Sequence, residues 1–125
     1  MYALEVHNGD SKIVNKNGDL FYTHGETNYL LGYTGTSTEL TLPENYNGEN
    51  YEIYKYSFYK NDKLTKVTIP DSVTSIGDYA FSGCSNLTSI KYRGTETQWN
   101  AITKGSDWIK NVPETSVITY NYTGE

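Results

Sequence analysis

Apolar and polar residues follow a pattern that recurs every 23 residues in the middle of this chain. Residues 64–69 read Leu-Thr-Lys-Val-Thr-Ile, and residues 87–92 repeat the outline as Leu-Thr-Ser-Ile-Lys-Tyr. Tyr-Ala-Phe at 79–81 likewise follows Tyr-Ser-Phe at 56–58 by 23 positions. A unit of this length cannot bury its apolar face alone and must stack on a neighbour. The pattern therefore predicts a repeat solenoid.

The unit that begins at residue 64 predicts two short strands in each coil. Val67 and Ile69 alternate with polar residues, so both side chains should lie on the inner face of a strand. Pro70 should end this strand, because proline has no backbone N–H to donate to a ladder. A second strand is expected over residues 73–76.

The rest of the unit should form the outer bend of the coil. We expect a helical turn around residues 79–81, with Gly83 in a left-handed conformation at its end. One unit earlier, Leu-Thr-Leu-Pro at 40–43 matches residues 67–70 at a spacing of 27. The extra residues fall in the Asn- and Gly-rich segment 44–51, which predicts an inserted loop.

The N-terminal part departs from the repeat. Residues 4–6 read Leu-Glu-Val and could be another copy of the first strand. Asn-Gly-Asp at 17–19 is typical of a tight turn. The apolar runs 20–22 and 29–33, separated by a glycine-containing turn, predict a β-hairpin. Gly32 within the second run indicates a bulge or a close backbone approach.

The C-terminal part also differs. Thr95 and Gln98 have the spacing of a capping box, so a short helix should follow. Trp99 and Ile102 would lie on one face of that helix. Residues 117–122 alternate Ile, Tyr and Tyr with polar residues, which predicts a last strand. A solenoid needs an atypical end unit to shield its open core, and this block suits that purpose.

Residues 64–88, Leu-Thr-Lys-Val-Thr-Ile-Pro-Asp-Ser-Val-Thr-Ser-Ile-Gly-Asp-Tyr-Ala-Phe-Ser-Gly-Cys-Ser-Asn-Leu-Thr, closely resemble the BspA-like leucine-rich repeat family. Residues 92–102 resemble the usual C-terminal end of its arrays. The resemblance implies a short right-handed α/β repeat solenoid, rich in β-structure, with a hairpin insertion and a C-terminal cap.

We expect one domain over residues 1–125. It should comprise a divergent N-terminal unit (1–39), the repeats (40–92) and the cap (93–125).

Composition restricts the possible functions. The chain has 10 Lys and Arg against 15 Asp and Glu, with no basic cluster, so nucleic acid is not an expected partner. Its 13 tyrosines favour a β-rich fold. Cys84, the single cysteine, is expected to be a small buried residue, not a reactive thiol.

No run of residues is long and apolar enough for a membrane span, and the start does not read as a signal peptide. The chain is therefore either a cytoplasmic protein or a fragment or mature form of a longer array.

Catalytic chemistry has little support in the sequence. His7 and His24 are the two histidines, and neither accompanies a nucleophile in a recognisable arrangement. No clustered metal-ligand pattern and no phosphate-binding glycine loop is present. We therefore expect no cofactor, no metal and no enzymatic activity.

Partner contacts have two candidate locations. If the first strands of the coils stack in register, their outward residues form two rows, Glu5-Thr41-Thr68-Lys91 and Glu39-Lys66-Ser89. Such rows are also typical of a simple solvated sheet surface. The second location is a set of tyrosines on or beside the inserted loop, for which binding and packing are both open: Tyr46, Tyr51, Tyr54 and Tyr59.

The predicted function is non-enzymatic protein binding. The resemblance implies a bacterial surface or secreted protein that binds a host matrix or cell-surface protein. The alternative is a stand-alone intracellular protein that binds or inhibits a partner.

Overall fold

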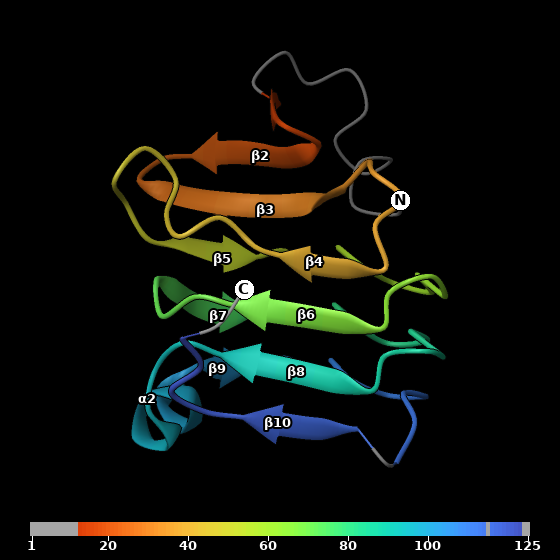
Figure 1. Ribbon diagram of the computed structural model, residues 1–125. Coiled ribbons are helices and arrows are strands. Elements are labelled where there is room, and N and C mark those ends of the chain that lie inside the picture. Colours follow the sequence, from red (N-terminus) through yellow and green to blue (C-terminus); the bar gives the residue numbers. More distant parts are fainter. Residues whose placement is uncertain (1–12, 115, 124–125) are drawn as a thin grey trace.

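The computed structural model describes residues 13–114 and 116–123. Two stacked sheets face each other, and the chain coils between them (Figure 1). Below the antiparallel hairpin, arrows in the front sheet point left and arrows in the rear sheet point right as the coils descend the view, so the solenoid is right-handed (Figure 1). The strands are β1 Val14–Lys16, β2 Asp19–His24, β3 Thr27–Tyr33, β4 Glu39–Thr41, β5 Tyr51–Ile53, β6 Lys66–Ile69, β7 Val73–Ile76, β8 Ser89–Tyr92, β9 Thr103–Lys104 and β10 Val117–Thr119.

The front sheet has the order β10-β8-β6-β4 and is parallel throughout. Leu40 pairs with Val67, Val67 with Ile90, and Ile90 with Ile118. All three predicted first strands of the coils therefore stack in the expected register. The further copy expected at residues 4–6 lies outside the described residues.

The rear sheet has the order β1-β2-β3-β5-β7-β9. The predicted hairpin is confirmed as the antiparallel pair β2–β3, and β3 then begins the parallel stack with β5 and β7. Leu20 pairs with Gly32 while Phe21 pairs with Leu30, which leaves Leu31 as the bulge that Gly32 indicated. The turn at residues 17–19 is also present, with left-handed Asn17 (φ 55°).

The helical turn predicted at residues 79–81 is wrong, because consecutive β-turns form this side of the solenoid. Tyr56 and Tyr79 are left-handed, with φ of 61° and 57°. Between the turns, alternate N–H groups bond to the adjacent coil, as in Tyr56 N–H to the Asp78 carbonyl at 3.0 Å. A helix would use these donors within its own coil and leave the coils unconnected.

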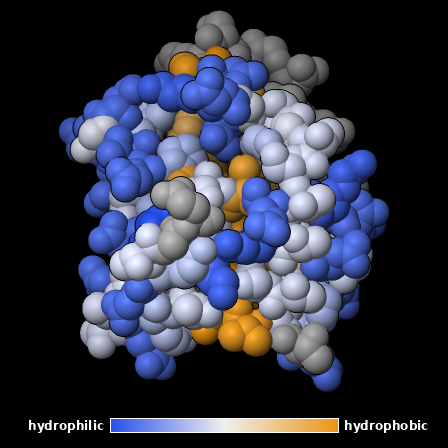
Figure 2. Space-filling view, in the orientation of Figure 1, coloured by the Kyte–Doolittle hydropathy of each residue, from blue (hydrophilic) through white to orange (hydrophobic). Residues whose placement is uncertain are grey.

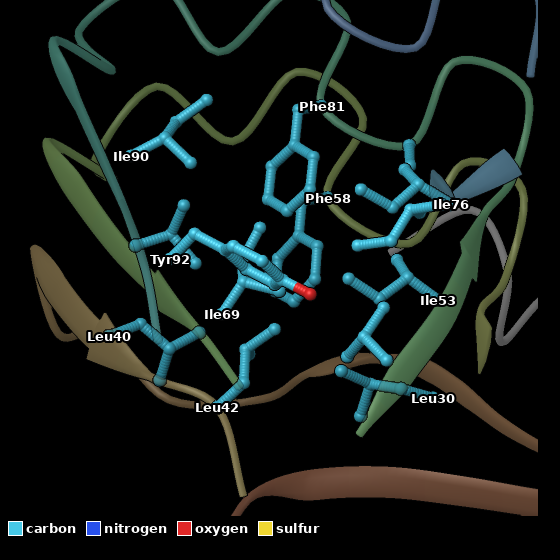
Figure 3. Close-up of a cluster of buried hydrophobic side chains, with 14 of the residues drawn as sticks. Leu30, Leu40, Leu42, Ile53, Phe58, Ile69, Ile76, Phe81, Ile90 and Tyr92 are labelled. Carbon is cyan, nitrogen blue, oxygen red and sulfur yellow. The ribbon is translucent and has the colours of Figure 1, made fainter. Parts of the chain in front are cut away.

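Side chains from all three sides fill the core between the sheets (Figure 3). Phe58 and Phe81, from successive turns, stack at 5.0 Å with an interplanar angle of 4°. Cys84 is fully buried, as predicted, and its thiol donates to the Phe58 carbonyl at 3.1 Å. Burial raises the pKa of the Cys84 thiol to about 12, so the thiol stays protonated and unreactive at neutral pH.

The C-terminal segment continues both sheets. Helix α2, Glu96–Ala101, stands between β8 and β9 in place of the proline turn. Its capping box is confirmed, because Thr95 and Gln98 each accept from the other's backbone N–H. Trp99 and Ile102 are buried, as their spacing predicted. The predicted last strand is present as β10, although it ends at Thr119.

Phe81→Ala should lower the free energy of unfolding by about 3–5 kcal/mol, because it removes a ring that stacks on Phe58 and contacts Trp108. Urea titration followed by circular dichroism would measure the loss. Ser85→Ala, at an exposed position of the same segment, should change the stability by less than about 0.5 kcal/mol. Equal stability of the Phe81 variant and the parent would contradict the stacked core.

Candidate binding surface

Two of the candidate contact tyrosines belong to the core, so their assignment to a binding surface is wrong. Tyr46 and Tyr51 are 8% and 1% exposed. Both rings pack on Phe21 of the hairpin, Tyr46 stacked at 4.4 Å and Tyr51 edge-on at 5.2 Å. The inserted loop makes a tight turn at Asn47 (φ 53°), which directs Tyr46 back towards the hairpin. The insertion thus closes the N-terminal end of the core.

The other two tyrosines lie on different sides of the molecule. Tyr54 contacts Tyr29 edge-on at 5.2 Å on the outer face of the rear sheet. The two line a shallow cavity of about 260 Å³ together with Tyr22 and His24. Tyr59 lies on the turns, packed edge-on against Tyr56 and Tyr79. The four predicted tyrosines therefore do not form one site.

The outer face of the front sheet holds the two predicted rows in the expected register. Glu39 pairs with Lys66, and Lys66 with Ser89; in the second row Thr41, Thr68 and Lys91 follow one another. Glu39 and Thr41 are exposed, and Lys66 and Lys91 are partly exposed. Glu5, expected at the start of one row, lies outside the described residues. Most of this face is hydrophilic in Figure 2, with apolar surface at its lower end near β10.

Tyr122 lies over this face and was not among the predicted contact residues. The Nζ atoms of Lys66 and Lys91 are 5.1 Å and 5.6 Å from the centre of its ring. The guanidinium carbon of Arg93 is 5.8 Å from the same point. The Lys66 ammonium also donates to the Tyr122 hydroxyl at 3.1 Å. Three cations from two adjacent strands and the following loop thus gather around one aromatic ring.

A change of chain direction after β10 places Tyr122 there. Asn121 is left-handed (φ 55°), a conformation that asparagine tolerates better than most residues. Backbone bonds from Asn121 N–H to the Gly94 carbonyl (2.8 Å) and from Tyr122 N–H to the Tyr92 carbonyl (2.9 Å) hold the segment beside β8. The sequence carried one signal for this bend, the asparagine between two tyrosines, but the apolar alternation suggested a continuing strand.

Thr68 is buried, so its assignment as an exposed contact residue is wrong for the structure as it stands. It is 1% exposed although it belongs to the outward row between Thr41 and Lys91. Its hydroxyl has no hydrogen-bond partner in residues 13–114 and 116–123. A buried hydroxyl without a partner costs about 1–3 kcal/mol relative to a paired one. This side chain is therefore a polar group whose partner the described structure does not supply.

The three cations have no carboxylate partner among the described residues. In residues 13–114 and 116–123, Lys66, Lys91 and Arg93 make no ion pair with Asp or Glu, and their polar contacts are with Tyr122 and Thr119. The chain as a whole has a formal charge of −5. This local positive cluster on an otherwise acidic protein should attract negatively charged groups to this face.

No three metal-binding side chains come together among the described residues. His24 stacks on Tyr22 at 6.3 Å, and His7 lies outside the described part. Within that part, no helix has the length and apolar character to cross a bilayer.

Asp19 is the one strongly perturbed carboxylate in the described chain, and its environment is structural. It is 8% exposed at the start of β2, and one of its carboxylate oxygens has no hydrogen-bond partner. Burial raises the pKa of this carboxyl group to about 6. Burial, together with the negative charge of this carboxylate, raises the pKa of the neighbouring Tyr51 hydroxyl.

Sequence comparison decides the family. The profile described as BspA type leucine-rich repeat region (6 copies) matches residues 32–111. This chain belongs to the BspA-type leucine-rich repeat family. The resemblance drawn from residues 64–88 is therefore confirmed. No curated protein matches the chain.

Solved structures of leucine-rich repeat proteins share the fold. A leucine-rich cell surface protein from Faecalibacterium prausnitzii is 26% identical, with a TM-score of 0.57 over 74% of this chain. The chain spans 26% of that protein's length.

Leucine-rich repeat proteins from Bacteroides capillosus and T. pallidum both give TM-scores of 0.59, at 20% and 18% identity. The match to the Bacteroides capillosus protein spans 88% of this chain and 99% of that protein. The match to the T. pallidum protein spans 86% of this chain and 64% of that protein. At these identities the likeness shows the fold alone.

Asp19→Asn should stabilise this leucine-rich repeat protein above pH 6. The raised pKa means that folding favours the protonated acid, so the stability contributed by Asp19 is present below about pH 4 and is lost as the pH rises to about 6. At pH 7.5 the free energy of unfolding of the variant should exceed that of the parent by about 1–3 kcal/mol. At pH 4 the two free energies should be nearly equal. Urea titrations at the two pH values test this; an equal difference at both would contradict it.

Thr68→Val should raise the free energy of unfolding by about 1 kcal/mol, because it removes the unpaired hydroxyl and keeps the side-chain shape. Thermal melts of the repeat protein would detect the change. Thr41→Val, in the same row but exposed, is the matched control and should be close to neutral. Destabilisation by Thr68→Val would mean that the hydroxyl has a partner.

Proposed function

We propose that the chain is a non-enzymatic protein-binding module, which contacts its partner through the outer face of the front sheet. The observation that carries this proposal is the group of three cations around Tyr122, none of which is paired with a carboxylate in the described chain. Exposed Glu39 and Thr41 extend the same surface towards β4.

The geometry of the face favours a protein partner. Parallel strands in register present side chains at intervals of about 4.8 Å, which makes an ordered and nearly flat array. Such an array suits contact with another surface better than enclosure of a small substrate. Tyrosine and arginine are also the residue types that contribute most at protein interfaces.

The charge of the face predicts how binding depends on salt. Lys66, Lys91 and Arg93 favour an acidic patch on the partner, which would accelerate association at low ionic strength. The screening length falls from about 10 Å at 0.1 M salt to about 3 Å at 1 M. Affinity should therefore decrease steeply with added salt.

The cellular setting is proposed from the similar proteins. The Faecalibacterium prausnitzii protein is described as a leucine-rich cell surface protein, and its structure matches 74% of this chain at 26% identity. We place the module on a bacterial cell surface, where its partner would be a host matrix protein or a protein of another cell.

Reversal of the front-face charge tests the proposal. Lys66→Glu combined with Lys91→Glu should weaken capture of acidic surface proteins at least tenfold in a pull-down quantified by mass spectrometry. The matched control is Lys55→Glu combined with Lys60→Glu, since these lysines contact Tyr54 and Tyr59 on other sides. The control should retain the captured set. If both double variants lost capture equally, or if neither lost it, binding by the front sheet would be contradicted.

A further inference from the structure

We infer that Tyr122 occupies the place that an aromatic side chain of the partner takes in the complex, and that this partner side chain belongs to an acidic segment. This inference rests on the proposed function and adds two elements to it. The first is the chemistry of the bound segment. The second is an intramolecular competitor that must leave before the segment binds.

Cations, and not core packing, hold the Tyr122 ring. Tyr120 packs against the main apolar core, but Tyr122 is not part of that core. Its ring contacts are the Lys66 and Lys91 ammonium groups and the Arg93 guanidinium, at 5.1–5.8 Å. Each such contact at a partly exposed site is weak. The surface thus has an aromatic-binding position that its own chain fills only loosely.

Tyr122 leaves part of the position unsatisfied. Its hydroxyl accepts a hydrogen bond from Lys66, 3.1 Å away. Thr68 pairs with Lys91 and follows Lys66 by two residues on the outward face; among the described residues its hydroxyl still has no partner, although the side chain is 1% exposed. A carboxylate or carbonyl oxygen beside the bound ring could accept from Thr68. A partner segment can supply this acceptor where Tyr122 does not.

The neighbours of Tyr122 explain why an acidic segment would displace it. Asn121 and Thr123, the described residues on either side of Tyr122, are uncharged, so neither of them neutralises the three cations. A segment with carboxylates on both sides of an aromatic residue would retain the ring contacts and add charge-assisted hydrogen bonds to lysine and arginine. Those added bonds distinguish the partner from the competitor.

The Tyr122 side chain can leave without disrupting the sheet. Strand β10 remains paired with β8 from Val117 to Thr119, independently of the ring. Asn121, with its left-handed backbone, separates β10 from Tyr122 and is the point where the direction of the chain changes. Release of the ring would therefore expose the three cations while the two sheets stay intact.

The test measures anisotropy of a fluorescein-labelled peptide, Glu-Asp-Glu-Tyr-Glu-Asp-Glu, titrated with the protein at 50 mM salt. Tyr122→Ala should bind the peptide about tenfold more tightly than the parent does, because the competing ring is gone and the front face is always free of it. Tyr122→Phe should stay within about twofold of the parent, since the ring remains. Lys66→Gln with Lys91→Gln should bind at least tenfold more weakly, and Thr68→Val about threefold more weakly.

Three controls make the outcomes separable. Lys55→Gln, at a lysine that contacts Tyr54 on the rear side, should bind like the parent. A peptide with alanine in place of tyrosine should lose the gain from Tyr122→Ala. A twelve-residue oligothymidine should bind more weakly than the acidic peptide. Melting curves confirm that each variant is folded; if Tyr122→Ala is not, Tyr122→Leu, which also removes the aromatic ring, replaces it and should show the same gain in affinity.

If Tyr122→Ala binds no more tightly while the lysine variants lose affinity, the competitor role is overturned and the front-face binding surface stands. If neither set of variants alters binding, both proposals fail. Tighter binding of the oligothymidine than of the acidic peptide would overturn the assignment of an acidic protein segment as partner.

Discussion

Hydrogen bonding from each coil to the next is the constraint on which this structure depends. The coils are joined on three sides: Val67 pairs with Ile90 in front, Ile53 with Ile76 behind, and Tyr56 N–H donates to the Asp78 carbonyl on the turns. Because all three ladders advance by one coil at a time, equivalent side chains stack directly. The 5.0 Å stack of Phe58 on Phe81 is one consequence, and the left-handed turn residues needed to expose alternate N–H groups are another.

The same stacking concentrates charge on the front face. Lys66 and Lys91 come from adjacent strands. The register of these strands brings both ammonium groups to one surface, where their like charges repel each other. The Tyr122 ring offsets part of this repulsion through its cation–π contacts. The Thr68 hydroxyl, unpaired among the described residues, further lowers the stability of the folded state. A surface that is suboptimal for stability at several neighbouring positions is typical of a region retained for binding.

Tyrosine serves distinct purposes in different parts of the molecule. At the N-terminal end Tyr46 and Tyr51 close the core against Phe21. On the turns Tyr56 and Tyr79 stack at 5.2 Å as repeat residues, and on the front face Tyr122 lies among cations. The ring supplies apolar area in the first two cases and a negative π-face in the third. Composition alone could not separate these environments.

The period of 23 residues and the alternation at Val67 and Ile69 determined the coil, the front-sheet register and the identity of the outward rows, because a stacked strand leaves each side chain a choice of two faces. The hairpin and the capping box were also predictable, because each depends on residues close together in the sequence. Tertiary structure decided the rest. The inserted loop folded back and buried Tyr46 and Tyr51, the turns bonded across coils where a helical turn was expected, and left-handed Asn121 carried Tyr122 onto the cations. Each of these depends on contacts between residues distant in the chain, which neither periodicity nor local propensity encodes.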